Sequence, residues 1–374
     1  QKHHACGRML VYYFNEDGTV IQSDQDFAIQ IPLETLRRCP NIVGVDIGCG
    51  MYTVRLDARE IDLARFDAAA HAVPSGMNVW EGRRESFDLE PLRCFRELKD
   101  TRRLQRSLGT LGGGNHFIEI DRASDGTLCL VIHSGSRNLG KQVAEHYQQL
   151  AVELNQGREA YFKKRDALIA EYKAAGRRRE IQAALEQLYW TKTPMTVPED
   201  LCYVYGEYLQ DYLHDVEICQ HFARRNRELI AEVLLSSTGL SGGEAFHTVH
   251  NYINTQEMIL RKGAIAAHDG EKVLIPINMR DGSVLAVGRG DPEWNYSAPH
   301  GAGRVMSRMA ARETLDMATY VEAMRGVYTT SVCPDTIDEA PMAYKSIEDI
   351  VGVIRDSVDV IDIMKPIYNF KASG

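Results

Sequence analysis

Five histidines and one cysteine lie in glycine-rich segments that are spread over about 250 residues of the sequence. The segments that carry them are Val45–Met51, Gly112–Glu119, Val131–Arg137, His247–Tyr252 and Pro299–Arg304. A thiol, a carboxylate and several imidazoles are ligand types that bind divalent transition metals. Glycine lets the backbone approach ligands and phosphates closely. The pattern therefore predicts an active site assembled from distant parts of the chain, with a metal site beside an anion site.

Asp46 and Cys49 are three residues apart in a predicted tight turn, so both side chains could reach one metal region. A thiolate can bridge two metals, and a neighbouring cation lowers its pKa. The alternative is a buried structural cysteine after a strand, with Asp46 capping the turn. For this pair taken alone, the alternative is favoured.

His116 begins an apolar strand after three glycines and Asn115. Because side chains alternate along a strand, Phe117 and Glu119 are expected to share the face opposite to that of His116. His133 closes another apolar strand before a turn of small residues, whose backbone amides could bind an anion. A lone histidine on a strand is more often a hydrogen-bonded core residue, and that alternative stays open for each one singly.

His247 and His250 match an i, i+3 pair on a helical turn or a loop. His300 precedes a predicted helix at 306–312, and anions are stabilised at a helix N-terminus. Arg304 could hold a phosphate there, whereas the alternative for His300 is a turn exposed to solvent. If all five histidines had only structural or solvent-exposed roles, their positions at strand ends and glycine-rich turns would be five independent coincidences. The combined metal and anion site is therefore favoured.

The elements that must position these residues begin with a β-rich stretch, followed by helices and two more strands. We expect a hairpin from 10–14 and 19–22, strands at 42–47 and 51–56, helices at 58–70 and 88–107, and strands at 116–120 and 128–133. The strand at 42–47 would deliver Asp46 to the turn before Cys49.

The middle of the chain is rich in helix-forming residues, at 141–190 and again at 206–235. Further strands are expected at 261–265, 273–277 and 284–287, with helices at 304–324 and 346–366. The candidate ligands come from both sides of the helical excursion at about 141–235. The sequence therefore predicts an α+β fold with a β-sheet core flanked by helices, as one domain over 1–374.

The bulk composition excludes several classes of protein. A net charge of −9 argues against binding nucleic acid through overall positive charge, and the runs Arg177–Arg179 and Arg224–Arg227 are interpreted as solvated helix faces. Eight cysteines without a CxxC pair favour a reducing, cytoplasmic compartment. No run of about 18 apolar residues predicts a membrane span. Because no initiator Met is present, we expect the sequence to begin inside a longer gene product.

Several long motifs occur in the order found in one enzyme family. They are Val-Gly-Val-Asp-Ile-Gly-Cys-Gly-Met, Leu-Gly-Thr-Leu-Gly-Gly-Gly-Asn-His-Phe-Ile-Glu, His-Ser-Gly-Ser-Arg, His-Asn-Tyr, Arg-Lys-Gly-Ala, Ser-Ala-Pro-His-Gly-Ala-Gly-Arg-Val-Met-Ser-Arg and Glu-Ala-Pro-Met-Ala-Tyr-Lys. With these motifs the chain resembles the RtcB family of RNA ligases from Asn41 to Lys371.

The resemblance implies a GTP- and Mn²⁺-dependent ligase that joins an RNA 3′-phosphate or 2′,3′-cyclic phosphate to a 5′-hydroxyl. His300 would be the nucleophile that becomes guanylylated, and GMP would then pass to the RNA 3′-phosphate. The implied setting is RNA repair or tRNA splicing in the cytoplasm, without a membrane.

The resemblance also implies a role for each matching residue. Cys49 would bridge two Mn²⁺ ions, with Asp46 and His116 completing one site and His133 and His250 the other. Residues implied to hold GTP are Asn115, Phe117, Glu119, Asn251, Gly301, Ala302, Gly303, Tyr344 and Lys371. Arg137 and Arg304 would hold RNA phosphate.

One departure from the family pattern lies near the start. Family members carry a Pro-Asp-x-His-x-Gly segment upstream of the Asp-Cys motif, whereas this sequence has only Lys2-His3-His4-Ala5-Cys6-Gly7-Arg8 there. Either the N-terminus is truncated or the chain is a divergent paralogue, in which sealing is weakened or redirected.

Two further hypotheses remain beside the ligase. One is a binuclear metal phosphoesterase that uses the same ligands without a covalent nucleotide. The other is a paralogue that binds RNA ends or a repair partner without turnover. Labelling of the protein by GTP discriminates the ligase from both.

Overall fold

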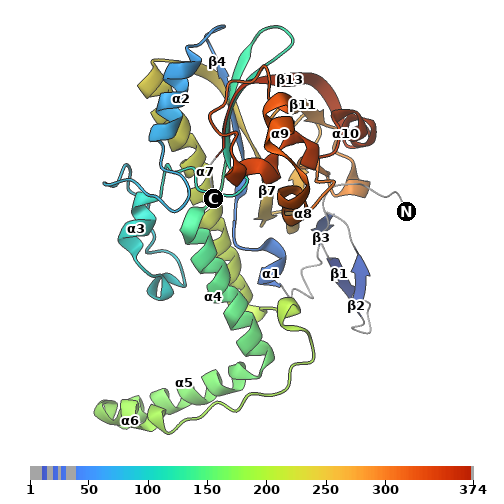
Figure 1. Cartoon of the computed structure of the whole chain (residues 1–374). Coiled ribbons are helices and arrows are strands. Elements are labelled where there is room, and N and C mark those ends of the chain that lie inside the picture. The colour runs from blue at the N-terminus through green and yellow to red at the C-terminus, as the bar shows by residue number, and fades with distance from the viewer. Residues whose placement is uncertain (1–10, 15–19, 24–26, 31–38, 372–374) are drawn as a thin grey trace.

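A nine-stranded antiparallel sheet forms the centre of the protein in the computed structural model, which describes residues 11–14, 20–23, 27–30 and 39–371 (Figure 1). Its strand order is β10-β11-β13-β5-β6-β4-β7-β8-β3. These strands are β3 Phe27–Gln30, β4 Cys49–Leu56, β5 Phe117–Arg122, β6 Leu128–Ser134, β7 Gly242–Asn254, β8 Ile259–Lys262, β10 Lys272–Asn278, β11 Gly282–Gly288 and β13 Val358–Lys371. Two-stranded sheets pair β1 Val11–Phe14 with β2 Val20–Ser23, and β9 Ala264–Ala266 with β12 Ser297–Pro299.

Helices lie on both sides of this sheet (Figure 1). They are α1 Pro40–Val43, α2 Leu63–Ala72, α3 Thr101–Arg106, α4 Arg137–Asn155, α5 Arg158–Ala174, α6 Ile181–Glu186, α7 Gly206–Thr238, α8 Arg308–Thr314, α9 Met317–Ala323 and α10 Ile347–Ile354. No helix among the described residues is both long and apolar enough to span a bilayer. Strands from both sides of the helical excursion share the sheet, so the predicted α+β class is confirmed; one domain over 1–374 stays a prediction.

The two faces of β5 serve different purposes, as the alternation of its side chains predicted. Ile118 and Ile120 are fully buried in a core that α2 and α7 complete. Phe117 and Glu119 point the other way and line a pocket. One strand therefore joins the hydrophobic core to the candidate site.

Two sequence predictions before β5 are wrong. Residues 42–47 do not form a strand: Pro40 begins the short helix α1, and Gly44, with a φ of 76°, ends it. Residues 88–107 do not form one helix, because Pro91 interrupts the periodicity. The helical parts of that range are a 3-10 helix at Phe95–Glu97 and α3.

The prediction of a helix over 346–366 is also wrong, because α10 ends at Ile354 and β13 begins at Val358. Pro366 is incompatible with a helix interior, and the β-branched residues before it favour a strand. The turn of the predicted N-terminal hairpin lies outside the described residues, although β1 and β2 do pair.

The helical excursion contains two unlike parts (Figure 1). Helices α4 and α7 run side by side and pack through apolar residues such as Tyr147 and Tyr212. Beyond them, α5 and α6 form an arm that projects from the body, and neither helix has a buried residue. The arm, defined here as residues 157–192, is thus a solvated extension rather than part of the core.

Candidate metal centre and nucleotide pocket

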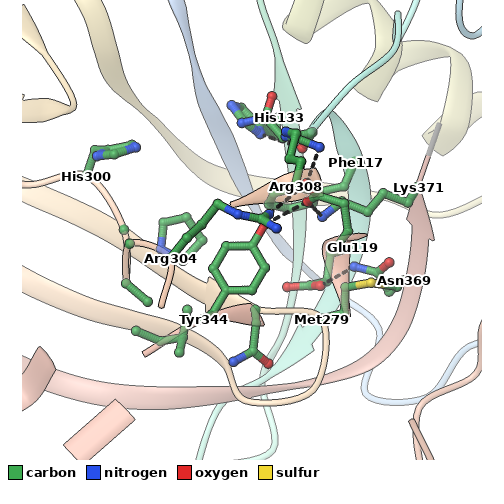
Figure 2. Close-up of a pocket in the computed structure, with 18 of the residues that line it drawn as sticks. Phe117, Glu119, His133, Met279, His300, Arg304, Arg308, Tyr344, Asn369 and Lys371 are labelled. Atoms are coloured by element: carbon green, nitrogen blue, oxygen red, sulfur yellow. Dashed lines mark hydrogen bonds and ion pairs between the residues drawn. The ribbon is translucent and has the colours of Figure 1, made fainter. Parts of the chain in front are cut away.

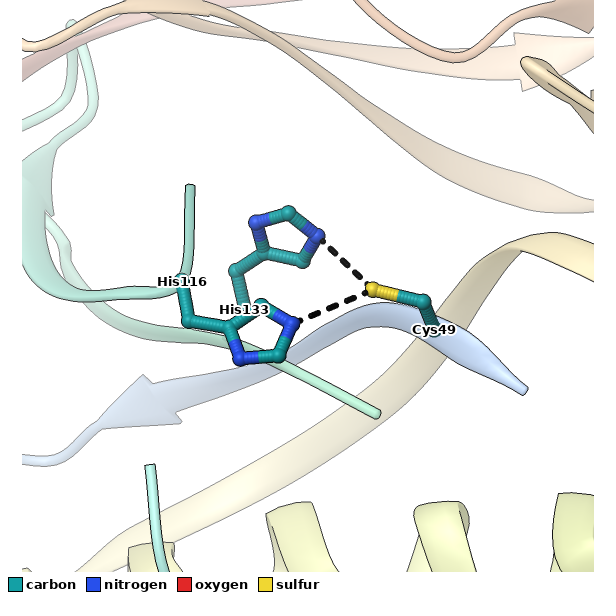
Figure 3. Close-up of side chains that lie close together, drawn as sticks. All are labelled: Cys49, His116 and His133. Carbon is teal, nitrogen blue, oxygen red and sulfur yellow. Dashed lines mark hydrogen bonds between the residues drawn. The ribbon is translucent and has the colours of Figure 1, made fainter. Parts of the chain in front are cut away.

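Ligand atoms from three strands converge at one end of the sheet (Figure 3). Cys49 begins β4, His133 lies near the end of β6, and His116 immediately precedes β5. The Cys49 Sγ lies 3.5 Å from His116 Nε2 and 3.2 Å from His133 Nε2. These three ligand atoms all lie within 4.8 Å of one another, and all three side chains are buried. The predicted convergence of distant residues is therefore present.

Two more predicted ligands extend the cluster in opposite directions. The Asp46 Oδ2 lies 3.0 Å from His116 Nε2, and the His250 Nε2 lies 3.4 Å from His133 Nε2. This arrangement places Cys49 between an Asp46–His116 pair and a His133–His250 pair. It is the pairing that two metal sites sharing one sulfur would need.

The protonation pattern of the cluster fits a bound cation. His116 and His133 each use Nδ1 to donate a hydrogen bond to a backbone carbonyl, of Leu111 at 2.8 Å and of Asn115 at 3.1 Å. Their Nε2 lone pairs therefore face Cys49. Second-shell bonds of this kind fix the tautomer that binds metals. Lone pairs, a thiol and a carboxylate so close together favour a shared positive ion.

Burial and the neighbouring groups set the charges of this cluster. Burial lowers the pKa of His133 and of His250 well below the ordinary range, so both imidazoles are neutral at pH 7. Burial and the nearby Asp46 raise the pKa of Cys49, so the thiol releases its proton only when a cation is present.

His247 does not join the cluster, because β7 separates it from His250. The two residues lie on a strand and not on a helical turn or loop, and an odd spacing on a strand sends side chains to opposite faces. His247 stacks on Tyr52 at 4.4 Å and contacts Glu228 of α7 at 3.1 Å. It is a half-buried histidine on the face of the sheet that α7 covers.

His300 follows β12 and lies beside the cluster, with its ring centroid 4.9 Å from that of His250. Its Nδ1 donates to the carbonyl of Gly263 at 2.7 Å, which leaves the Nε2 lone pair free. Burial lowers its pKa, so the ring is neutral at pH 7. The predicted helix begins at Arg308 rather than at 306, and its N-cap residue Ser307 lines the same pocket as His300.

A pocket of about 670 Å³ opens from His133, His250 and His300 (Figure 2). Of the residues expected to hold a nucleotide, it is lined by Asn115, Phe117, Glu119, Gly301, Ala302, Gly303, Tyr344 and Lys371. Arg304 lines it as well. The pocket is large enough for a nucleotide and ends at the candidate metal cluster.

The inner wall of the pocket holds a group of buried polar side chains on β5 and β13. Asn369 donates to Glu119 at 2.5 Å, and both residues are at most 3% exposed. Burial, together with the adjacent Asp121, raises the pKa of Glu119. Burial also raises the pKa of Asp121 to about 6. The two carboxyl groups therefore hold a proton between them more readily than exposed ones would.

Glu339, which sequence reasoning missed, is the hydrogen-bond acceptor on one side of the pocket. Its carboxylate accepts from Tyr344 Oη at 2.7 Å, Arg308 at 2.6 Å and Arg304 at 3.3 Å, and it pairs with Lys371. Glu339 is 2% exposed. Its position in the Glu-Ala-Pro-Met-Ala-Tyr-Lys motif was the only signal available.

Two of the residues expected to hold GTP or RNA phosphate lie outside the pocket lining. Asn251 donates its side-chain amide to the backbone carbonyl of Asp46 at 2.6 Å, behind the cluster. Arg137 begins α4 with a φ of 58° and reaches Thr110 Oγ1 and the carbonyl of Gly76, each at 3.3 Å. A positive φ at a non-glycine residue is costly and is often found at functional sites.

Two glycines leave room for these side chains. A Cβ at Gly112 would lie 1.9 Å from the Arg137 guanidinium, and a Cβ at Gly135 would lie 2.0 Å from the Asp46 carboxylate. The glycines that the motifs carry at these positions are therefore required by close approach.

Comparison with known proteins gives consistent matches. A family model described as tRNA-splicing ligase RtcB matches residues 90–372. The RNA-splicing ligase RtcB of Escherichia coli K12 is 31% identical, over 89% of this chain and 83% of its own length. The tRNA-splicing ligase RtcB of Aeropyrum pernix is 26% identical, over 84% and 77%. The RNA-splicing ligase RtcB of Mycobacterium tuberculosis is 29% identical, over 85% and 86%.

Proposed function

The chain belongs to the RtcB family, and on that premise we propose that it is a GTP- and Mn²⁺-dependent RNA ligase. It joins an RNA 3′-phosphate or 2′,3′-cyclic phosphate end to a 5′-hydroxyl end. The observation that carries the proposal is the position of His300, which lies between a buried Cys-His cluster and a pocket of nucleotide size.

His300 is suited to act as a nucleophile. The bond from Nδ1 to the carbonyl of Gly263 orients the ring and leaves Nε2 unprotonated. In the proposed first step, Nε2 attacks the α-phosphorus of GTP, an N–P bond forms, and the P–O bond to pyrophosphate breaks. Burial keeps the imidazole neutral and reactive at pH 7.

Two later steps complete the proposed reaction. An oxygen of the RNA 3′-phosphate attacks the GMP phosphorus, and the N–P bond to His300 breaks. The 5′-hydroxyl oxygen then attacks the activated RNA phosphorus, loses its proton to the surroundings and expels GMP. A cyclic phosphate end is first opened by water.

The proposed metal ligands are Asp46, Cys49, His116, His133 and His250. Their donor set of one thiol, one carboxylate and three imidazoles fits two divalent ions. When bound, such ions polarise phosphate oxygens and neutralise charge that develops during displacement.

The proposed nucleotide residues line the pocket beside His300. The guanine edge presents one acceptor and two donors, which match the Lys371 ammonium and the Glu119 carboxyl. Gly301, Ala302 and Gly303 leave space next to the nucleophile. We propose Arg304 and Arg137 for RNA phosphate. Arg304 lines the pocket, and Arg137 lies beside the cluster, with its Nη1 3.5 Å from the imidazole of His116.

The test is incubation with GTP labelled at the α-phosphate, with Mn²⁺, Co²⁺ or Zn²⁺ supplied in turn. We expect a labelled protein band that His300→Ala abolishes, and joining of 3′-phosphate and 5′-hydroxyl RNAs. His221→Ala is the matched control, since that histidine is exposed on α7, and it should still be labelled. Hydrolysis of phosphoesters without any labelled protein would replace the ligase by a phosphoesterase.

A further inference from the structure

Asn226 and Arg227 are adjacent buried polar residues of α7 that belong neither to the ligand set nor to the pocket lining. Asn226 is 0% exposed and Arg227 is 1% exposed. The interpretation of the run Arg224–Arg227 as a solvated face is wrong for its last members. Residues two positions apart do not share a helix face, so Arg227 points inward whereas Arg225 pairs with Glu85 and Glu232 at the surface.

Arg227 connects the two strand ends that carry Cys49 and His133. A single terminal nitrogen, Nη1, donates to the carbonyl of Gly48 at 2.7 Å and to the carbonyl of Ser134 at 2.8 Å. Gly48 precedes Cys49, and Ser134 follows His133. The guanidinium therefore bridges the backbone next to two candidate ligands whose own side-chain atoms are 3.2 Å apart.

Asn226 makes the same kind of connection to a third segment. Its Oδ1 accepts from the backbone amides of Gly109 at 2.7 Å and Thr110 at 3.1 Å. Its Nδ2 donates to the carbonyl of Thr110 at 3.1 Å and to Ser134 Oγ at 3.0 Å. The next residue, Leu111, supplies the carbonyl that orients His116. The side-chain amide of Asn226 thus connects residues 109–110, in the loop before His116, to the end of β6.

Helix α7 also packs directly against the turn that precedes Cys49. A Cβ at Gly48, whose φ is 77°, would lie 2.8 Å from the Cβ of Ala223 and 3.0 Å from the Cα of Gln220. Ala223 lies one helical turn before Arg227. The helix therefore fixes both the position and the hydrogen bonding of this turn.

We propose that Asn226 and Arg227 are positioning residues of the metal centre. By holding the backbone at 48, 110 and 134, they set the spacing of Cys49, His116 and His133 and so the affinity for divalent cations. The inference rests on the metal centre of the proposed function. It extends the site to a helix that contributes no ligand.

The test measures Co²⁺ binding by the purified full chain, through the thiolate–cobalt and d–d absorption bands. Replacing Arg227 by Met keeps the long side chain and removes the bridge. We expect affinity to fall about 10–100-fold, the usual effect of removing a second-shell partner. Arg224→Met is the matched control: it removes an arginine from the same helix, with a side chain 65% exposed, and should bind like the unmodified protein.

Stability is measured in parallel to separate positioning from folding. Should Arg227→Met lower the melting temperature yet bind Co²⁺ within twofold of the unmodified protein, the residue supports only the fold and the inference is overturned. If Arg227→Met does not fold, Arg227→Lys and Asn226→Ala decide, with weaker cobalt binding expected in both and unchanged binding as the contrary result.

Failure of the proposed function gives a different pattern. An unmodified chain that binds no Co²⁺ removes the metal centre itself. A chain that binds Co²⁺ but takes no label from GTP removes the ligase proposal and leaves the role of Asn226 and Arg227 intact.

Discussion

Two runs of arginine that look alike in the sequence have opposite surroundings in the structure. Arg177–Arg179 lies in the arm, where all three of its residues are exposed, whereas Arg224–Arg227 ends in a buried residue that bridges two strand ends. The difference comes from the helix that carries each run. Helix α7 buries an apolar stripe that includes Phe222 and Ile230, whereas the 3-10 helix Arg178–Glu180, which follows α5, buries nothing. Whether an arginine is buried and bonds to the backbone therefore depends on whether its helix packs an apolar face against the core.

The largest effect is expected at Cys49, which lies at the centre of the buried cluster that Arg227 supports and that the exposed arginine run does not contact. Cys49→Ser should weaken Co²⁺ binding more than about 100-fold, beyond the loss typical of a second-shell partner, and should abolish labelling by GTP. Cys129→Ser is the matched control, because that thiol is also buried in the sheet but lies outside the cluster. Equal cobalt binding by both variants would contradict the assignment of Cys49.

A smaller effect is expected at Glu339, whose carboxylate on the pocket wall binds four hydrogen-bond donors. Glu339→Gln leaves the charges of Arg304, Arg308 and Lys371 without their shared anion. We expect the free energy of unfolding to fall by about 3 kcal/mol, the lower end for breaking a buried pair, since Gln still accepts hydrogen bonds. Urea unfolding checks the stability. The KM for GTP should rise while His300 remains reactive; unchanged KM would separate Glu339 from the nucleotide.

The buried carboxyl pair Glu119 and Asp121 predicts that the stability of the protein depends on pH, unlike that of an exposed carboxyl group. Because the folded-state pKa of Asp121 is raised to about 6, its contribution to stability is present below about pH 4 and is lost as pH rises through 6. The free energy of unfolding of Asp121→Asn, relative to that of the unmodified protein, should therefore rise as the pH increases from 4 to 6. Above pH 6 the gain should be constant, at up to about 3 kcal/mol.

Urea unfolding at several pH values measures this gain. Asp359→Asn is the control, because Asp359 is a largely exposed carboxylate on β13 and its replacement removes the same charge from the surface. A constant difference across pH for Asp121→Asn would mean that both carboxyl groups titrate normally.

The smallest effect is expected in the arm. Replacing both Arg178 and Arg179 by Ala should change the free energy of unfolding by less than about 0.5 kcal/mol, because neither side chain is buried. GTP labelling should be unchanged. A large loss of labelling would show that the exposed arginine run of the arm also contributes to the reaction with GTP, which would contradict the contrast between the two runs.

The sequence predicted the ligand-bearing strands well because their apolar runs and glycine-rich turns are local signals. Strands at 51–56, 116–120 and 128–133 are confirmed within a few residues. The face of His247 was not recovered, since it depends on pairing between β7 and β4, which are far apart in the chain. The strand at 358–371 was missed although Pro366 and the β-branched residues before it are local signals against a helix.

The two residues that organise the site from behind could not be identified in advance. Glu339 and Arg227 are charged, and charged residues are mostly exposed unless partners surround them. Those partners come from positions as distant as 48, 134 and 371. Only the folded arrangement reveals that these side chains are enclosed.

Strand β13 has a consequence for how the protein is made. It lies between β11 and β5 in the sheet, yet it follows every other strand in sequence order. Until the ribosome has released residues 358–371, the nascent chain exposes the edges of both neighbours, which are templates for aggregation. Chaperone contact during synthesis should therefore concentrate on β5 and β11, and it should end when this late strand docks.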